Sequence, residues 1–248
     1  MTGTSGTTDP AALPAVRPRR VVTDRRGGRS ASPYDSFNLG AHVGDAPADV
    51  AANRERLARE LGVPGERLVW MSQVHGNGVA VVDGPQEAPV PDVDALVTTT
   101  PGLVLCVLVA DCVPVLLSDA EAGVVAAVHA GREGVRQKVV PAALAAMGRL
   151  GARPASITAL LGPAVCGACY EVPREMQAEV ARVVPSAAVR TRTGTPGLDL
   201  RAGVAEQLGR AGVGQVVHDP RCTVEDRFLY SHRRDGVTGR QAGVVWLS

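Results

Sequence analysis

The sequence predicts an α+β fold, in which mixed β-sheets are flanked by helices in a single compact domain. Short apolar runs rich in Val, Leu and Cys fill the centre of the chain, and such runs are typical of strands buried on both faces. Helical patterns lie before and after these runs without regular alternation, which favours α+β over a simple doubly wound sheet. At 248 residues the chain is long for one domain, but it can bury a substantial core.

The chain is expected to begin with a tail and to continue as one domain. Residues 1–17 are rich in Thr, Gly, Ser, Ala and Pro without periodicity, so we predict a disordered tail there. The domain then covers residues 18–248. The basic clusters at residues 17–20 and 25–26 are interpreted as parts of a solvated, flexible segment.

Helices are predicted where apolar residues recur at helical spacing between capping and terminating residues. These segments are residues 49–61, 135–150, 173–184 and 200–208. Asp49 and Asp199 are expected to cap two of them, and Pro141 has to lie in a first turn or kink its helix.

Strands are predicted for runs of β-branched and other apolar residues that are bounded by turn residues. They are residues 68–71, 79–82, 95–98, 103–110, 113–118, 124–128, 157–161, 214–217 and 242–247. The runs between residues 95 and 128 are almost entirely apolar, which indicates a sheet covered on both faces.

Composition and charge narrow the function classes. The formal net charge is +1 and aromatic residues make up 3%, so neither charge nor stacking side chains indicate a nucleic-acid partner. The longest apolar stretch, residues 103–117, is broken by Asp111 and Pro114, and the N-terminus lacks a signal-peptide pattern, so we expect no membrane span and no export. Five cysteines, mostly in or beside apolar runs, favour free thiols in a cytoplasmic protein.

Three side chains able to bind metal or act as nucleophiles lie at predicted strand ends. His75 follows one strand, Cys112 lies in the polar break between two buried strands, and His129 ends another. Two imidazoles and a thiolate would bind zinc and leave a fourth position open, as in catalytic sites. The same residues could instead form a Cys nucleophile with a His base, and strand-end His and Cys are often only packed or hydrogen-bonded.

The other cysteines and histidines give weaker signals. Cys166 and Cys169 form a CxxC pair, whose spacing suggests a redox pair or half of a metal site, but we favour packing because no second CxxC pair exists. Cys106 and Cys222 are interpreted as buried or incidental thiols. Hydrogen-bonded surface or turn positions are expected for the remaining histidines, His42, His218 and His232.

Short motifs along the chain occur in the order of a known family. They are FNLG (37–40), HVGD (42–45), NR (53–54), QVHG (73–76), DALVT (94–98), ADC (110–112), VHAG (128–131), GP (162–163), CYEV (169–172) and RRDG (233–236). Over about residues 34–247 the chain resembles the polyphenol oxidase/laccase-domain family, also called the peptidoglycan editing factor or purine nucleoside phosphorylase family.

The resemblance implies a zinc enzyme that acts on purine nucleosides. It implies one zinc ion per chain, held by the catalytic residues His75, Cys112 and His129, and it favours zinc over copper. The implied reactions are phosphorolysis of adenosine, guanosine, inosine and methylthioadenosine, and deamination of adenosine. The partners are then a purine nucleoside and phosphate, and we expect a monomer. Zinc chemistry suits the deamination, whereas phosphorolysis calls for arginines around the phosphate.

Five further residues are candidates for substrate contact or for support of the metal ligands. Arg54 and Arg234 are expected to bind phosphate or ribose, and Asn38 and Gln73 to hydrogen-bond the base or sugar. Asp111, beside the candidate ligand cysteine, could orient a ligand histidine. A solvated role for Arg54, a turn-shaping role for Asn38 and a cap on the strand break for Asp111 are the competing interpretations.

The chain departs from the family pattern beside His129. Family members usually read HAGWRG, whereas this chain has Arg132 and Glu133 in place of the Trp-Arg pair. Glu133 would repel an anionic substrate group, and Arg132 could supply the cation from the next position. His232 stands where tyrosine is common, so the family's substrate preference does not transfer directly.

Two other kinds of enzyme and a non-enzymatic role compete with the nucleoside reaction. A Cys/His amide hydrolase that edits peptidoglycan precursors would use the same cysteine and histidines. Phenol oxidation is disfavoured, because multicopper chemistry needs roughly ten histidines, and the chain has five. A binding protein would hold no metal and turn over no nucleoside.

Overall fold

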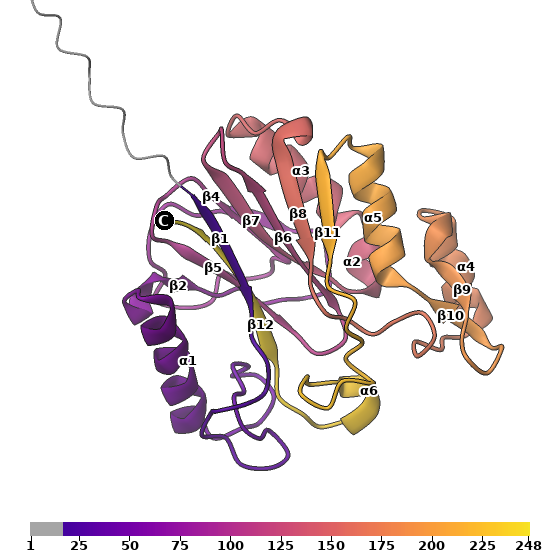
Figure 1. The fold of residues 1–248 in the computed structure, drawn as a ribbon, viewed down its shortest axis with the longest axis horizontal. Helices are drawn as coiled ribbons and strands as arrows, with labels where there is room; N and C mark the ends of the chain where they lie inside the picture. Colours follow the sequence, from indigo (N-terminus) through magenta and orange to yellow (C-terminus); the bar gives the residue numbers. More distant parts are fainter. Residues whose placement is uncertain (1–16) are drawn as a thin grey trace, which may run out of the picture.

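The computed structural model describes residues 17–248, which form a four-layer α+β domain. Helix α1 (Pro47–Leu61) covers the first sheet, the second sheet packs behind it, and further helices cover the far side (Figure 1). Both sheets contain parallel and antiparallel pairs, so the predicted α+β fold with mixed sheets is confirmed. The predicted tail, residues 1–17, lies outside the described residues except for Arg17.

The strands form two large sheets and a short ribbon. The first sheet has the order β1 (Pro18–Val22), β12 (Gln241–Leu247), β5 (Val104–Val109), β2 (Leu68–Val69). The second has the order β11 (Gln215–His218), β8 (Ile157–Leu161), β6 (Val113–Asp119), β7 (Val124–Ala130), β4 (Ala95–Thr98), β3 (Val79–Val81). The ribbon pairs β9 (Ala188–Arg190) with β10 (Pro196–Leu198).

Strand β5 shows why the sheets stack. Successive side chains of a strand point to opposite faces. Cys106 and the residues two positions before and after it pack in one cluster with Leu57 of α1. Val107 and the residues two positions before and after it pack in another cluster with Leu116 of the second sheet. A run that is apolar at every position is therefore buried on both faces, as its sequence predicts.

Five further helices are described over residues 17–248, and the first two of them contact strand β7 of the second sheet. They are α2 (Arg132–Arg136), α3 (Val139–Arg149), α4 (Arg174–Ala181), α5 (Leu200–Arg210) and α6 (His232–Asp235), with short 3-10 turns at Gly65–Arg67, Pro154–Ser156 and Pro185–Ala187. Asp199 caps α5, as predicted, by accepting a bond from the Ala202 amide at 3.0 Å. Pro141 lies in the first turn of α3. Asp49 is a first-turn residue of α1 and not its cap, because Ala46 occupies that position.

The basic N-terminal stretch is ordered, so the prediction of a flexible segment is wrong there. Residues 18–22 form β1, which pairs antiparallel with β12 along its whole length. Arg20 is half-buried beside the sheet, and its position alternates with that of Val21. The basic composition of the stretch does not prevent strand formation. Long arginine side chains can extend from the edge of a sheet into solvent while their backbone groups remain hydrogen-bonded to the neighbouring strand. Nothing in the sequence identified the short elements β9, β10 and α6.

None of the helices described over residues 17–248 has both the length and the apolar character needed to cross a bilayer. Of the candidate functional residues, Cys112 and His129 lie where β5 ends, β6 begins and β7 ends. Because β6 and β7 run antiparallel and pair Pro114 with His129, the first turn before β6 lies beside the end of β7. The fold thus brings distant sequence positions to one edge of the second sheet.

Candidate metal site and its cavity

His75, Cys112 and His129 lie together, although 37 and 17 positions separate them in the sequence. Their potential ligand atoms all lie within 4.8 Å of one another. The Cys112 sulfur is 3.9 Å from His75 Nε2, and the two imidazole rings are nearly perpendicular, with centroids 4.6 Å apart. Two imidazole nitrogens and a sulfur at this separation can bind one zinc-like cation and leave a position open to the cavity.

The backbone has an unusual conformation at one of these residues and directly before another. His75 has φ +60° and Asp111, just before Cys112, has φ +97°. Non-glycine residues adopt positive φ at an energetic cost, and such residues concentrate at functional sites. The left-handed turns place the His75 ring and the Cys112 thiol against the end of β7.

Asp94 holds the two histidine segments in place. Its carboxylate is fully buried and contacts His129 Nδ1 at 2.7 Å. It also accepts backbone bonds from Val74, His75 and Gly76 at 3.3, 3.0 and 2.7 Å. Burial disfavours the charged form, but the bonds from His129 and from the Gly76 and Val74 amides lower the pKa of Asp94. With Nδ1 bonded to a carboxylate, His129 presents Nε2 to the cavity.

The sequence pointed to Asp111 as the carboxylate that orients a histidine, but the carboxylate that contacts His129 is that of Asp94. Asp111 instead accepts bonds at 2.6 Å from Thr223 Oγ1 and from the Arg233 amide, so it joins two loops at the strand break. Asp94 stands at the start of the DALVT motif, directly before a buried strand. That position was the available signal, since a charged residue beside a fully buried strand needs a partner.

The charges of the thiol and the imidazoles are coupled. Burial would raise the pKa of Cys112, but His129 and His75 outweigh it and lower that pKa to about 6. Conversely, burial would lower the pKa of His129, but Cys112 and Asp94 raise it to about 9. The pair thus favours the thiolate, the form that either binds a metal or attacks an electrophile.

Gly131 leaves room for the His75 ring and the Cys112 thiol. A Cβ atom at this position would lie 2.8 Å from His75 Cδ2 and 3.1 Å from the Cys112 sulfur. The backbone follows a path that any residue can adopt, with φ −78°, so the glycine is required for space and not for backbone conformation. This cradle fits a bound cation.

We expect Gly131→Ala to fold but to bind metal at least about tenfold more weakly, because the new methyl group pushes the His75 ring and Cys112 apart. Titration of metal-free protein with zinc against a competing chelator measures this change. Gly148→Ala is the matched control, since a Cβ there meets open space and helix α3 gains about 0.5–1 kcal/mol from the change. Equal zinc affinity in both variants would contradict the role given to Gly131.

A cavity of about 500 Å³ opens beside the three residues. That volume suits a small-molecule ligand. Basic side chains are prominent in its lining: His42, Arg132, His232, Arg233 and Arg240. Gln73 also borders it, but its amide is bonded at both ends to the Leu108 backbone at 2.8 Å, so it supports the end of β5.

Asn38 and Arg54 lie outside the cavity lining and are engaged within the protein. Asn38 is fully buried, and its side-chain Oδ1 accepts hydrogen bonds from the backbone amides of Gly40 and Arg240, both at 2.9 Å. The Arg54 guanidinium stacks on Trp70 at 4.1 Å and donates to the Leu39 carbonyl at 3.0 Å. Asn38 therefore reaches the cavity only indirectly, through the backbone of Arg240.

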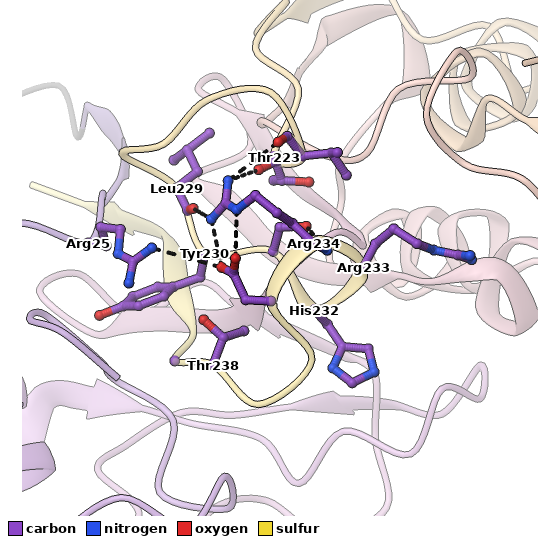
Figure 2. A network of polar contacts seen from close by, with 12 residues as sticks. Arg25, Thr223, Leu229, Tyr230, His232, Arg233, Arg234 and Thr238 are labelled. Carbon is purple, nitrogen blue, oxygen red and sulfur yellow. Dashed lines mark hydrogen bonds and ion pairs between the residues drawn. The ribbon is translucent and has the colours of Figure 1, made fainter. Parts of the chain in front are cut away.

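Arg234 also lies outside the lining, and Figure 2 shows why. Its guanidinium donates to the carbonyls of Thr223 and Leu229 at 2.8 Å and pairs with Asp235 at 2.7 Å. The side chains of His232 and Arg233 point away from this network, and both line the cavity. Arg234, which the sequence favoured as a substrate contact, instead holds the loop together, and Arg233 borders the cavity.

The Arg132–Glu133 departure changes the charge of the cavity less than the sequence suggests. Arg132 forms an ion pair with Glu133, and Glu133 also pairs with Arg136 at 2.8 Å. Within residues 17–248, Arg233 and Arg240 have no carboxylate within ion-pair distance. His42 also lines the cavity, although no sequence pattern selected it. Burial and the nearby Arg240 lower its pKa, which favours the neutral imidazole.

The layered scaffold and the two histidines and cysteine at its strand ends define an α+β protein with an open, candidate metal-binding cavity. The family model described as multi-copper polyphenol oxidoreductase laccase matches residues 19–248, and the chain belongs to this family.

Relatives and solved structures agree with this assignment. A Mycobacterium tuberculosis protein named purine nucleoside phosphorylase is 58% identical over 94% of this chain and 93% of its own length. A Streptomyces coelicolor protein of the same name is 59% identical, with coverage of 91% and 93%. The crystal structure of YlmD from Geobacillus stearothermophilus superposes with a TM-score of 0.87 at 34% identity, covering 95% of this chain and 93% of that one.

Proposed function

We propose that this protein is a zinc-dependent purine nucleoside phosphorylase. The observation that carries the proposal is the convergence of His75, Cys112 and His129 at the edge of a basic cavity large enough for a nucleoside. The relatives named purine nucleoside phosphorylase support the substrate class, since they match almost the whole chain.

The donor set supports one zinc ion in this cavity. Two imidazoles and a thiolate suit zinc, which when bound supplies Lewis acidity and activates water. Copper accepts the same ligands, but several copper centres would need more histidines than the five in this chain. In this proposal His75, Cys112 and His129 are the catalytic metal ligands, and Asp94 orients His129.

Phosphate is assigned to Arg233 and Arg240. Both border the cavity without a carboxylate partner among the described residues, whereas the charge of Arg132 is offset by Glu133. Phosphorolysis needs the phosphate held near the ribose C1′ while positive charge develops on the sugar, and guanidinium groups bind phosphate oxygens well. Tyr170 also lines the cavity, and its ring lies 5.1 Å from the Arg233 guanidinium, which keeps that arginine beside the ligand space.

We expect Arg240→Ala to raise the KM for phosphate about tenfold or more, because a charge-assisted hydrogen bond contributes about 1.5–3 kcal/mol. The KM for inosine should change much less. Steady-state kinetics with each substrate varied in turn separates the two effects. Arg174→Ala, which removes an exposed arginine at the start of α4, is the matched control. An unchanged phosphate KM would remove Arg240 from the phosphate site.

Phosphorolysis and deamination are separated by one assay. Adenosine is incubated with metal-analysed protein, with and without phosphate, and adenine, inosine and hypoxanthine are resolved. We expect adenine only when phosphate is present, and inosine in both cases if the companion deaminase activity is also present. Methylthioadenosine replaces adenosine in a parallel reaction. No release of base from any nucleoside in the presence of phosphate would overturn the proposal.

A Cys/His amide hydrolase acting on peptidoglycan precursors is the second candidate, and the lowered pKa of Cys112 favours it. The two candidates differ in the reactivity of this thiol. If zinc holds Cys112, an alkylating reagent labels it slowly in the loaded protein and rapidly after chelation. Equal labelling in both states would favour the hydrolase.

A further inference from the structure

A second group of potential metal ligands lies outside the cavity lining. Cys166, Cys169, Cys222 and Glu225 each offer one ligand atom, and these atoms all lie within 4.8 Å of one another. The sequence expectation was that these thiols are packed, because the CxxC pair has no second CxxC partner. The structure shows a partner of a different kind, since Cys222-Thr-Val-Glu225 repeats the two-residue spacing with a carboxylate at its end.

Backbone contacts hold the two halves of this group together. The segment at Cys222 pairs with Ala164 as a parallel bridge, and the Thr223 amide donates to the Ala164 carbonyl at 3.2 Å. The Cys166 amide donates to the Cys222 sulfur at 3.3 Å. An amide aimed at a sulfur favours its thiolate form, which is the form that binds metals.

The CxxC turn is closely packed against the rest of the protein. The amides of Cys169 and Tyr170 both donate to the Cys166 carbonyl at 3.0 Å. A Cβ atom on Gly167 would lie 2.8 Å from Val189 Cγ2, so a residue with a side chain does not fit inside the turn. The turn therefore holds its two thiols in one arrangement before any ligand binds.

The donor set and the surrounding charge fit zinc. Three sulfurs and a carboxylate oxygen complete a tetrahedral site without an open position, and zinc–sulfur bonds of about 2.3 Å place two donors about 3.8 Å apart. The present separations of up to 4.8 Å need a contraction of only about 1 Å. Arg192 pairs with Glu225, and its amide donates to the Ala168 carbonyl at 3.0 Å, so a cation lies beside the negative ligands.

We propose that Cys166, Cys169, Cys222 and Glu225 form a closed structural site for a second divalent cation of the zinc class. A disulfide explains the same residues less well, because it would leave one thiol unpaired and would give Glu225 no role. The site joins two segments that shape the cavity: Val165 and Tyr170, which flank the CxxC turn, line it. Thr223, which follows Cys222, bonds to Asp111 beside Cys112.

Metal counting tests this site independently of the nucleoside activity. The full chain is purified with a reductant and without chelators, and zinc per chain is measured by plasma mass spectrometry. We expect about two zinc ions in the unchanged protein, and about one each in Cys169→Ser and in Cys112→Ala, with almost none in the double variant. Cys106→Ala, which removes a buried β5 thiol that belongs to neither group of potential ligands, should keep both ions.

A spectroscopic measurement guards against variants that bind no metal because they fail to fold. With cobalt in place of zinc, Cys112→Ala should retain strong sulfur-to-metal charge-transfer absorption, which Cys169→Ser on the same background removes. Glu225→Gln, a mild change at an exposed side chain, should weaken cobalt binding while circular dichroism stays unchanged. A single zinc ion that is lost in Cys112→Ala and kept in Cys169→Ser would overturn the proposal. A disulfide among the three thiols that persists in the presence of the reductant would overturn it as well.

Discussion

Cys112→Ala is expected to lose the cavity metal and to lower kcat/KM for inosine phosphorolysis on the order of a thousandfold or more. A catalytic metal contributes several kcal/mol to transition-state stabilisation, and each 1.36 kcal/mol corresponds to about a factor of ten in rate. Two imidazoles alone hold zinc weakly, and His129 would keep its bond to Asp94 without the thiolate that faces it. Parallel measurements of zinc per chain and of steady-state kinetics test both parts.

The control for this variant is Cys106→Ala. Cys106 is fully buried in β5 and packs in the cluster below α1, so its removal tests the loss of a thiol without touching the cavity. We expect the control to keep its metal and its activity, with a modest loss of stability. Full phosphorolysis by Cys112→Ala protein that has lost its cavity zinc would contradict the proposed metal-dependent reaction. Full activity with the zinc retained would remove Cys112 from the ligand set.

Asp94→Ala is expected to have the largest effect on stability, about 3–5 kcal/mol, because it leaves buried groups without their charged partner. The amides of Val74, His75 and Gly76 lose their acceptor, and so does His129 Nδ1. Urea unfolding of the metal-free protein measures this loss. Loss of the carboxylate behind a ligand histidine also weakens metal binding by about 10–100-fold, which a chelator competition measures.

Asp94→Asn separates the two roles of this residue. The amide keeps one oxygen for the backbone donors but removes the negative charge that holds the His129 proton on Nδ1. We therefore expect most of the stability to return while zinc affinity stays low. Asp83→Ala, at an exposed position, is the control and should change neither property. Wild-type zinc affinity in Asp94→Asn would show that the carboxylate does not support the metal ligand.

The elements that sequence patterns predicted well are those in which one physical requirement dominates. The run at residues 157–161 and the run at residues 95–98 are strands with the predicted bounds, because apolar side chains bounded by turn residues have few alternatives. β1 was missed because its pairing with β12 comes from the other end of the chain, which no local pattern reveals.

The candidate triad was selected from residue types at strand ends together with the family motifs, and the structure brings its three members together. Its surroundings depended on tertiary structure. Asp94 meets His129 because β4 pairs with β7, and that pairing is not visible in either segment alone. Arg233 and not Arg234 borders the cavity because the short helix α6 turns the latter toward loop carbonyls. Cys222 reaches the CxxC turn through a single bridge to Ala164.

The chain passes from one sheet to the other between β5 and β6, and Cys112 lies on this crossing. His129 belongs to the second sheet, and Gln73, two residues before His75, is bonded to Leu108 at the end of β5 in the first. The three candidate ligands therefore come together only after the two sheets have docked. During refolding, metal binding should consequently occur late. Its rate would then report the rate at which the two sheets dock.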